Sequence, residues 1–245
     1  MATSTSRLTE LVTTVRGRRL VAAVIAAAMA IVATSLVVSR SSMLHLRHLE
    51  VVGTTSLTRA EVVRLAGLSS STNVLWFDPR AVERRLESDP WVATATVSRR
   101  LPATIRISVV ERAPVAMIRD ERGFTVVATD GVALSTVAAD PALPEIEVVA
   151  GSTSRWGNAQ ARAAAARAIA GLDGGGRPTV VRAVVRAGTL TVELDGGTRV
   201  EFGEPIGIEA KAAAARRILL WASLQRASVA RVNVIAPDSP TATFA

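Results

Sequence analysis

Few residues of this chain could carry out acid–base, nucleophilic or metal chemistry. The sequence has no cysteine, which removes thiolate catalysis, disulfides and cysteine metal sites. Its two histidines, His45 and His48, are three positions apart in an expected strand, so they should point to opposite faces and share no metal ion. Any histidine-based triad would have to use one of them. We therefore expect no metal site and no histidine-based active site.

The remaining reactive groups suit structural roles better than catalytic ones. Lys211 is the only lysine, and no serine lies within one helical turn of it, so we predict a solvated charge rather than a serine–lysine dyad. Asp130 and Asp195 precede glycines, which is typical of turns, and Asp89 lies at an expected helix end. The glycines at 174–176 lack the neighbours of a phosphate-binding loop. These patterns predict no enzyme activity, no cofactor and no small-molecule substrate.

The composition is that of a folded protein whose positive charge is concentrated beside one apolar segment. Of the 245 residues 49% are hydrophobic and 20% are charged, with a formal net charge of +8. Residues 1–47 hold six arginines and one glutamate. Aromatic residues make up only 3% of the chain, and binding of single strands depends on aromatic stacking. We therefore expect no nucleic-acid partner.

The segment 20–39 contains no charged residue and is long enough to cross a membrane once. A helix of this length covers roughly 30 Å, about one hydrocarbon core. Three arginines closely precede the segment and one closely follows it. This excess of positive charge before the segment predicts that residues 1–19 are a short cytoplasmic tail and that the chain after the segment lies outside the membrane. The flanking residues are Arg16, Arg18, Arg19 and Arg40. A cleaved signal peptide is the alternative, although its apolar region usually spans only about 7–15 residues.

Residues 43–112 predict a small α+β domain with the order strand, helix, helix, strand, strand. Thr58 and Glu61 have the spacing of a capping box, and Asp78 followed by Pro79 is typical of a helix start. The two helices are expected to cover one face of the sheet. The expected strands are 44–52, 91–98 and 104–110.

Residues 113–236 predict a second, mainly antiparallel β domain with two helices, and residues 237–245 a free tail. Short strand-like runs are separated by turns that contain glycine or proline. The expected helices are 158–170 and 206–226. The expected strands are 115–118, 124–128, 132–134, 146–149, 179–186, 189–194, 198–202 and 228–236.

The second of these helices, 206–226, has apolar residues on two sides. One stripe consists of Ile208, Ala212, Ala215, Leu219 and Ala222. A separate stripe consists of Arg217, Leu220, Trp221 and Leu224. The first stripe should face its own domain, while the second is either buried there too or forms a surface for a partner.

The first module resembles the POTRA module of the FtsQ/DivIB family of bacterial cell-division proteins. The resemblance rests on four motifs that follow one another directly after a single apolar segment. They are Glu-Val-Val-Gly at 50–53, Pro-Trp-Val at 90–92, Val-Ser-Arg-Arg-Leu-Pro at 97–102 and Val-Glu-Arg-Ala-Pro-Val-Ala at 110–116. One departure is Thr54, where the family often has asparagine after the turn glycine.

The second module resembles the β domain of the same family through more modest features. They are Asp130-Gly131, Leu143-Pro144, Phe202-Gly203, Lys211 early in the last long helix, and a final strand that runs into Pro237. The closing strand departs from the family at Asn233, where aspartate is often found. In all, the resemblance covers about residues 44–238.

The resemblance implies a non-enzymatic scaffold of the division machinery, the divisome, held at the septum by one membrane helix. Its implied partners are the coiled-coil division proteins FtsB and FtsL and other divisome members. We expect strand addition at an edge strand 229–236, with the neighbouring helix supporting the incoming segment. By position, the residues expected to contact a partner are Arg216, Trp221, Val232, Asn233 and Val234.

The alternative function is a POTRA-containing protein of polypeptide transport, or a chaperone-like envelope protein, which would use the first module to receive extended segments. Such proteins usually carry repeated POTRA units and a membrane barrel, whereas one unit and one apolar helix are visible in this sequence.

Overall fold

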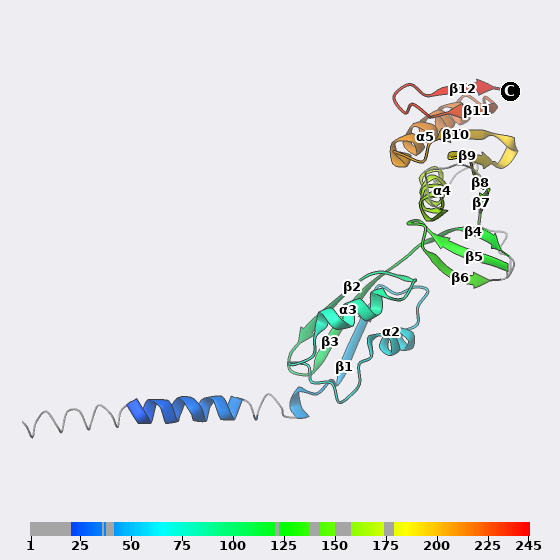
Figure 1. The fold of residues 1–245 in the computed structure, drawn as a ribbon. Helices are drawn as coiled ribbons and strands as arrows, with labels where there is room; N and C mark the ends of the chain where they lie inside the picture. The colour runs from blue at the N-terminus through cyan, green and yellow to red at the C-terminus, as the bar shows by residue number, and fades with distance from the viewer. Residues whose placement is uncertain are drawn as a thin grey trace, which may run out of the picture. The chain divides into compact units, whose positions relative to one another are not determined.

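The protein is an α+β chain that folds into two compact units (Figure 1). The computed structural model describes residues 21–35, 37, 42–120, 123–137, 143–149, 158–173 and 179–245. The first unit runs up to Ser88 and includes Thr94–Val110. The second unit consists of Asp89–Ala93 and Glu111–Ala245.

The apolar segment at the beginning of the chain is described only in part. Residues 21–35 are helical and exposed, and within the described ranges no helix has the length and hydropathy of a membrane span. The expected cytoplasmic tail, 1–19, lies outside the described residues. So do the expected flanking residues Arg16, Arg18, Arg19 and Arg40.

The first unit has the predicted order of strands and helices, which confirms the α+β prediction for this module. A 3₁₀ turn at Ser42–Leu44 precedes it. Its elements are β1 (His48–Val52), α2 (Arg59–Ala66), α3 (Pro79–Glu87), β2 (Val92–Arg100) and β3 (Thr104–Glu111). The sheet order is β1-β3-β2, so β3 is central and β1 and β2 are edges; β1 runs parallel to β3.

Local capping chemistry explains where the two helices of this unit begin. The Thr58 side chain accepts the Glu61 N–H and the Glu61 carboxylate accepts the Thr58 N–H, which is the predicted capping box. Asp78 caps α3, and Pro79 occupies the first turn, where no backbone N–H is needed. Each helix then buries one apolar face. The fully buried core includes Val62, Val82, Leu86, Ile105 and Ile107.

The second unit is built on one nine-stranded sheet. Its strands are β4 (Pro114–Asp120), β5 (Gly123–Ala128), β6 (Ala133–Val137), β7 (Glu145–Val148), β8 (Val180–Arg186), β9 (Thr189–Leu194), β10 (Arg199–Gly203), β11 (Val229–Asn233) and β12 (Thr241–Phe244). Their spatial order is β12-β11-β10-β9-β8-β7-β4-β5-β6. Most pairs are antiparallel, as predicted, but β4 with β7, β7 with β8, and β10 with β11 are parallel.

Two helices, α4 (Asn158–Leu172) and α5 (Ile208–Leu224), pack against this sheet. Small alanines of both helices lie in one apolar cluster with alternate strand residues such as Ile146, Val192 and Phe202. Since strand side chains alternate between faces, the residues between these point away from the helices. The sheet is therefore covered on the face that carries the core.

The opposite face of the sheet, away from α4 and α5, carries a ladder of ion pairs between arginines and glutamates of neighbouring strands. Arg119 of β4 pairs with Glu145 of β7, and Arg182 of β8 bridges β7 and β9. The remaining steps join β9, β10 and β11. The pairs are Arg119–Glu145 at 3.4 Å, Arg182–Glu147 at 3.6 Å, Arg182–Glu193 at 2.8 Å, Arg199–Glu193 at 3.4 Å and Arg231–Glu201 at 3.4 Å.

Candidate partner-binding surface

The helix α5 presents two different faces, as its two apolar stripes predict. Ile208, Ala212, Ala215 and Ala222 are buried against the sheet. The second stripe is exposed, with Leu220 at 63%, Trp221 at 53% and Leu224 at 73% of their full accessibility. Of the two alternatives for this stripe, burial within its own unit is therefore wrong. An exposed row of large apolar side chains remains as a candidate surface for a partner.

The start of α5 is held by a buried ammonium group, which corrects the prediction that Lys211 is a solvated charge. Only 7% of Lys211 is accessible, and its Nζ donates hydrogen bonds of 2.8 Å to the carbonyl oxygens of Phe202 and Glu204. Burial lowers the pKa of Lys211, while the nearby Glu204 carboxylate acts in the opposite direction. Lys211 thus fastens α5 to the end of β10.

The strand β12 corrects two expectations about the C-terminal region. Residues 237–245, expected to be a free tail, contain β12, which pairs antiparallel with β11. The expected edge strand 229–236 is therefore an interior strand: Val232 lies opposite Val200 of β10 on one side and opposite Ala242 of β12 on the other. The edge at this end of the sheet is β12.

Three of the expected partner residues lie on or just after β11, and the structure places them where side-chain contact with a partner is restricted. Val232 and Val234 are fully buried in the core. Asn233 is half-buried; its Nδ2 donates to Glu201 Oε2 at 3.5 Å, and its Oδ1 accepts the Ile235 N–H at 3.0 Å. The other two expected residues, Arg216 and Trp221, are exposed on α5.

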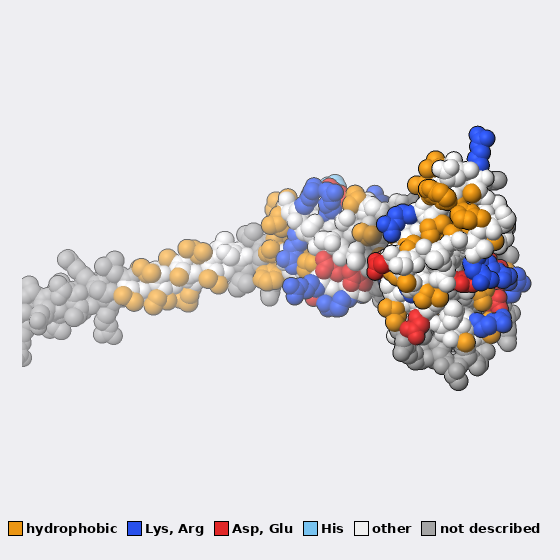
Figure 2. All heavy atoms as spheres, turned by 90° about the horizontal axis from the view of Figure 1, so that it is seen from above, with side chains coloured by type: hydrophobic (Ala, Val, Ile, Leu, Met, Phe, Trp, Pro, Cys, Tyr) orange, Lys and Arg blue, Asp and Glu red, His pale blue; other side chains and the backbone are white. Residues whose placement is uncertain are grey.

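An aromatic pair connects the exposed stripe of α5 to the edge strand. The rings of Trp221 and Phe244 meet edge to face, with centroids 6.0 Å apart and an interplanar angle of 62°. Phe244 is itself 48% accessible. Figure 2 views the molecule from the side on which Figure 1 draws β12, β11 and α5, and hydrophobic side chains gather there on the second unit. We call Leu220, Trp221, Leu224 and Phe244 the apolar patch.

The backbone of β12 offers hydrogen-bonding groups beside this patch. The Ala245 N–H donates to the Ser228 carbonyl at 2.9 Å, so it points toward the preceding strand. Because N–H groups alternate in direction along an antiparallel strand, those of Ala242 and Phe244 point outward. Among the described residues no side chain hydrogen-bonds to the backbone of β12. An extended segment could therefore pair with this edge.

Cations border the apolar patch on the helix side. Arg216, Arg217 and Arg226 are exposed, and no described residue forms an ion pair with them. They differ from Arg231, which the Glu201 carboxylate neutralises on the open face of the sheet. A partner that brings carboxylates alongside apolar side chains would suit this border.

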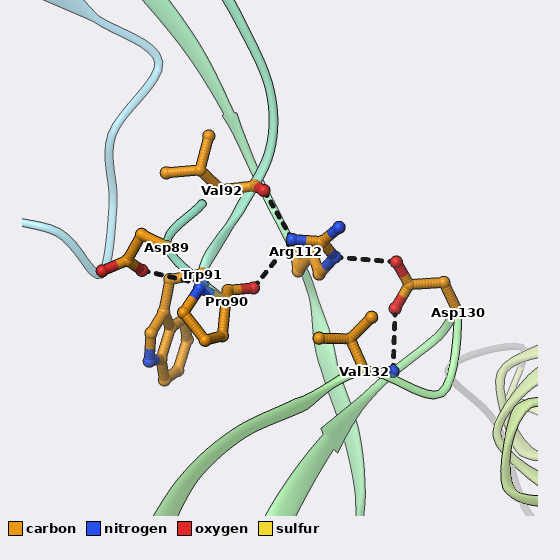
Figure 3. Close-up of polar contacts among 7 residues, drawn as sticks. All are labelled: Asp89, Pro90, Trp91, Val92, Arg112, Asp130 and Val132. Atoms are coloured by element: carbon orange, nitrogen blue, oxygen red, sulfur yellow. Dashed lines mark hydrogen bonds and ion pairs between the residues drawn. The ribbon is translucent and has the colours of Figure 1, made fainter. Parts of the chain in front are cut away.

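A second polar cluster fixes the segment that enters β2 to the turn between β5 and β6 (Figure 3). Arg112 Nε donates to Asp130 Oδ2 at 2.7 Å, and its Nη1 donates to the carbonyl oxygens of Pro90, at 2.9 Å, and Val92. Asp130 Oδ1 accepts the Val132 N–H at 3.2 Å, which confirms its predicted turn role. All these residues belong to the second unit.

The charges of Arg112 and Asp130 stabilise the local structure. Burial would raise the pKa of Asp130, but the hydrogen bonds from Arg112 and from the Val132 N–H outweigh it and hold the pKa below its usual value. The hydrogen bonds of Arg112 Nη1 and Asp130 Oδ1 each fix a backbone segment. Sequence reasoning identified Asp130 as a turn residue but missed Arg112, whose partners are far from it along the chain.

Metal-binding residues do not gather in the part of the chain that the structure describes. No group of three or more histidine, cysteine or acidic residues there could hold an ion. His45 forms an isolated bridge with Asn73, and His48 begins β1.

Comparison with known proteins matches the first unit to a defined domain type. Residues 44–112 match the POTRA domain of the FtsQ type. The chain is 32% identical over 134 residues to the cell division protein FtsQ of Mycolicibacterium smegmatis, which is 55% of this chain and 40% of that protein. It is 30% identical over 134 residues to FtsQ of Mycobacterium tuberculosis, 55% of this chain and 43% of that protein.

A third relative gives a shorter match. FtsQ of Geobacter sp. is 38% identical over 80 residues, 33% of this chain and 29% of that protein. The chain thus spans less than half the length of each of these curated relatives.

Proposed function

Because the chain belongs to the FtsQ/DivIB family of bacterial cell-division proteins, we propose that it is a non-enzymatic scaffold of the division machinery. In this proposal one helix at 20–39 anchors it in the cell membrane at the septum, and its two units bind other septal proteins outside. The anchor rests on the uncharged sequence of that segment. A role in cell division is supported by the relatives, all of which are named cell division proteins.

The observation that carries the binding role is the unpaired edge of β12 beside the apolar patch. A partner strand that pairs with β12 gains backbone hydrogen bonds, and side chains that follow it can cover Trp221 and Phe244. Exposed aromatic residues next to a free edge are typical of a surface that binds a specific partner. The proposed strand acceptor is therefore β12 rather than the strand 229–236.

The proposed partners are the FtsB/FtsL-type coiled-coil proteins and other divisome members. A coiled-coil protein can supply both a helical segment for the exposed stripe of α5 and an extended segment for β12. Arg216 and Trp221 remain proposed contact residues. Val232 and Asn233 support the surface through their pairing with β12, and Val234 supports it through its burial in the core.

The test measures the affinity of the full-length chain for the FtsB/FtsL-type pair of the same bacterium. Ala242→Pro removes an outward N–H of β12, while the matched variant Ala242→Ser keeps it. We expect the proline to weaken binding at least about tenfold, since the strand partner loses a backbone hydrogen bond and its fit, and the serine to bind as wild type. Urea unfolding of both variants checks that the fold persists.

Two outcomes would count against the proposal. A folded Ala242→Pro variant that binds as tightly as wild type would exclude pairing at β12. Absence of binding by the wild-type chain would exclude the proposed partner pair. Proline at Val232 is unsuitable for this test, because Val232 is paired on both sides and the substitution would disturb the sheet itself.

A further inference from the structure

The three-stranded sheet of the first unit has an edge that its own helix occupies. β2 pairs with β3 on one side only, so N–H groups on its other side lack a strand partner. The Ala95 N–H donates to Glu87 Oε1 at 3.0 Å, and the Val97 N–H donates to Glu83 Oε1 at 2.8 Å. Both carboxylates come from α3. Two successive outward N–H groups of β2 are thus taken by side chains.

The fit between helix and strand has a simple geometric basis. Glu83 and Glu87 are one turn apart on α3, a rise of about 6 Å, and outward residues of a strand repeat every two positions, about 6.6–6.8 Å. The pairing runs in opposite directions, because the earlier glutamate meets the later strand residue. A helix with acceptors at this spacing therefore matches consecutive donors of an edge strand.

Packing fixes the helix in the position that this match requires. Val82 and Leu86 of α3 are fully buried, and Ala95 and Val97 on β2 are buried with 8% and 6% of their surface accessible. The glutamates lie on the flank of α3 next to its buried face: Glu83 is half-buried, while Glu87 is exposed. The hydrogen bonds are charge-assisted, which makes them stronger than those between neutral groups.

We propose that Glu83 and Glu87 close the β2 edge of the POTRA domain to strand addition, and that a second copy of this chain pairs along β2 when both carboxylates are removed. A strand that joined β2 would need the same two N–H groups and would leave two carboxylates without partners. Identical edge strands pair readily when nothing blocks them, which makes a second copy the first occupant of an opened edge. This inference is independent of the partner proposed for β12.

The closed edge also bears on the alternative function considered from the sequence. A POTRA unit that receives extended polypeptides needs an accessible edge strand. Here β2 is occupied by two carboxylates from α3, which leaves β1 as the other edge of this sheet.

The first measurement is amide hydrogen exchange in the full-length chain. In Glu83→Ala/Glu87→Ala the amides of Ala95 and Val97 should exchange at least about tenfold faster than in wild type, because each loses its acceptor. The matched variant Glu83→Gln/Glu87→Gln keeps an acceptor oxygen and should stay closer to wild type. The amides of Ile105 and Ile107 in β3 report whether the core remains intact.

Single variants keep the test decisive if the double variant loses its core. Glu83→Ala should accelerate only Val97, and Glu87→Ala only Ala95. Unchanged exchange at both amides, or acceleration without this correspondence, would overturn the proposal.

The second measurement is sedimentation velocity over a range of protein concentrations. The alanine double variant should self-associate more strongly than wild type, and the glutamine variant should not. Faster exchange without any added self-association would also overturn the proposal, since the carboxylates would then satisfy the amides without excluding a strand.

Discussion

The edge strands β2 and β12 present the same physical problem and carry opposite solutions. Each has backbone N–H groups that face away from the rest of its sheet. On β2 two of them are bonded to carboxylates of α3, whereas on β12 no described side chain occupies them. The helix beside β12 instead places apolar side chains next to the edge.

The difference separates an edge that is protected from one that is available. An unprotected edge is a hazard of aggregation, so its presence next to exposed aromatic residues favours use by a specific partner. Charge alone would not distinguish the two edges, because arginines are exposed in both units. Three further predictions concern the attachment of α5, the apolar patch and the turn at Asp130.

The largest effect is expected where α5 is fastened to the sheet. Lys211→Met should lower the free energy of unfolding by about 2–4 kcal/mol, since two buried carbonyl groups lose their donor. Urea unfolding followed by circular dichroism measures this change. The matched variant Arg216→Met, on an exposed position of the same helix, should change stability little. Equal stability of wild type and Lys211→Met would show that α5 does not depend on this contact.

A smaller effect, on binding rather than folding, is expected at the apolar patch. Trp221→Ala should weaken binding of the FtsB/FtsL-type pair by about 2 kcal/mol, because aromatic residues at interfaces often contribute this much. Trp76, 63% accessible in the first unit, provides the control: Trp76→Ala should leave that affinity unchanged. Affinities can be measured by isothermal titration calorimetry. Equal losses in both variants would remove the distinction between the two regions.

The smallest effect is a pH dependence at Asp130. Its pKa is lower in the folded chain than its ordinary value of 3.8, so its contribution to stability is present above that value and is lost as the pH falls below it. The contribution should be under about 1 kcal/mol, since the pair with Arg112 is partly exposed. Unfolding of wild type and Asp130→Asn should differ at pH 7, and the difference should shrink as the pH falls below 3.8. A constant difference would assign the effect to packing.

The sequence predicted most of the first unit because its signals are local. The capping box at Thr58, the proline at the start of α3 and the alternation of β2 each act within a few residues. Both stripes of α5 were also recognisable from spacing. What remained open was whether the second stripe is covered, because that depends on the position of the sheet.

The errors arose where long-range contacts decide. Nothing near Lys211 in an alanine-rich helix indicates that its ammonium group reaches two carbonyls at the end of β10. β12 is a four-residue run after two prolines, and it is a strand only because β11 provides its ladder. Glu83 and Glu87 resemble ordinary surface charges, since their acceptor role depends on where β2 lies.

The ladder of ion pairs on the open face of the large sheet also fixes the pairing register of its strands. A shift of one residue in any middle strand would exchange its two faces and bring Arg182, Glu193 or Glu201 beneath the helices. Burial of an unpaired charge is strongly unfavourable, so such slippage is suppressed. The register of the sheet is therefore already fixed when a segment pairs with β12. That register decides which side chains of the added segment lie on the helix side of the sheet and which lie on the open face.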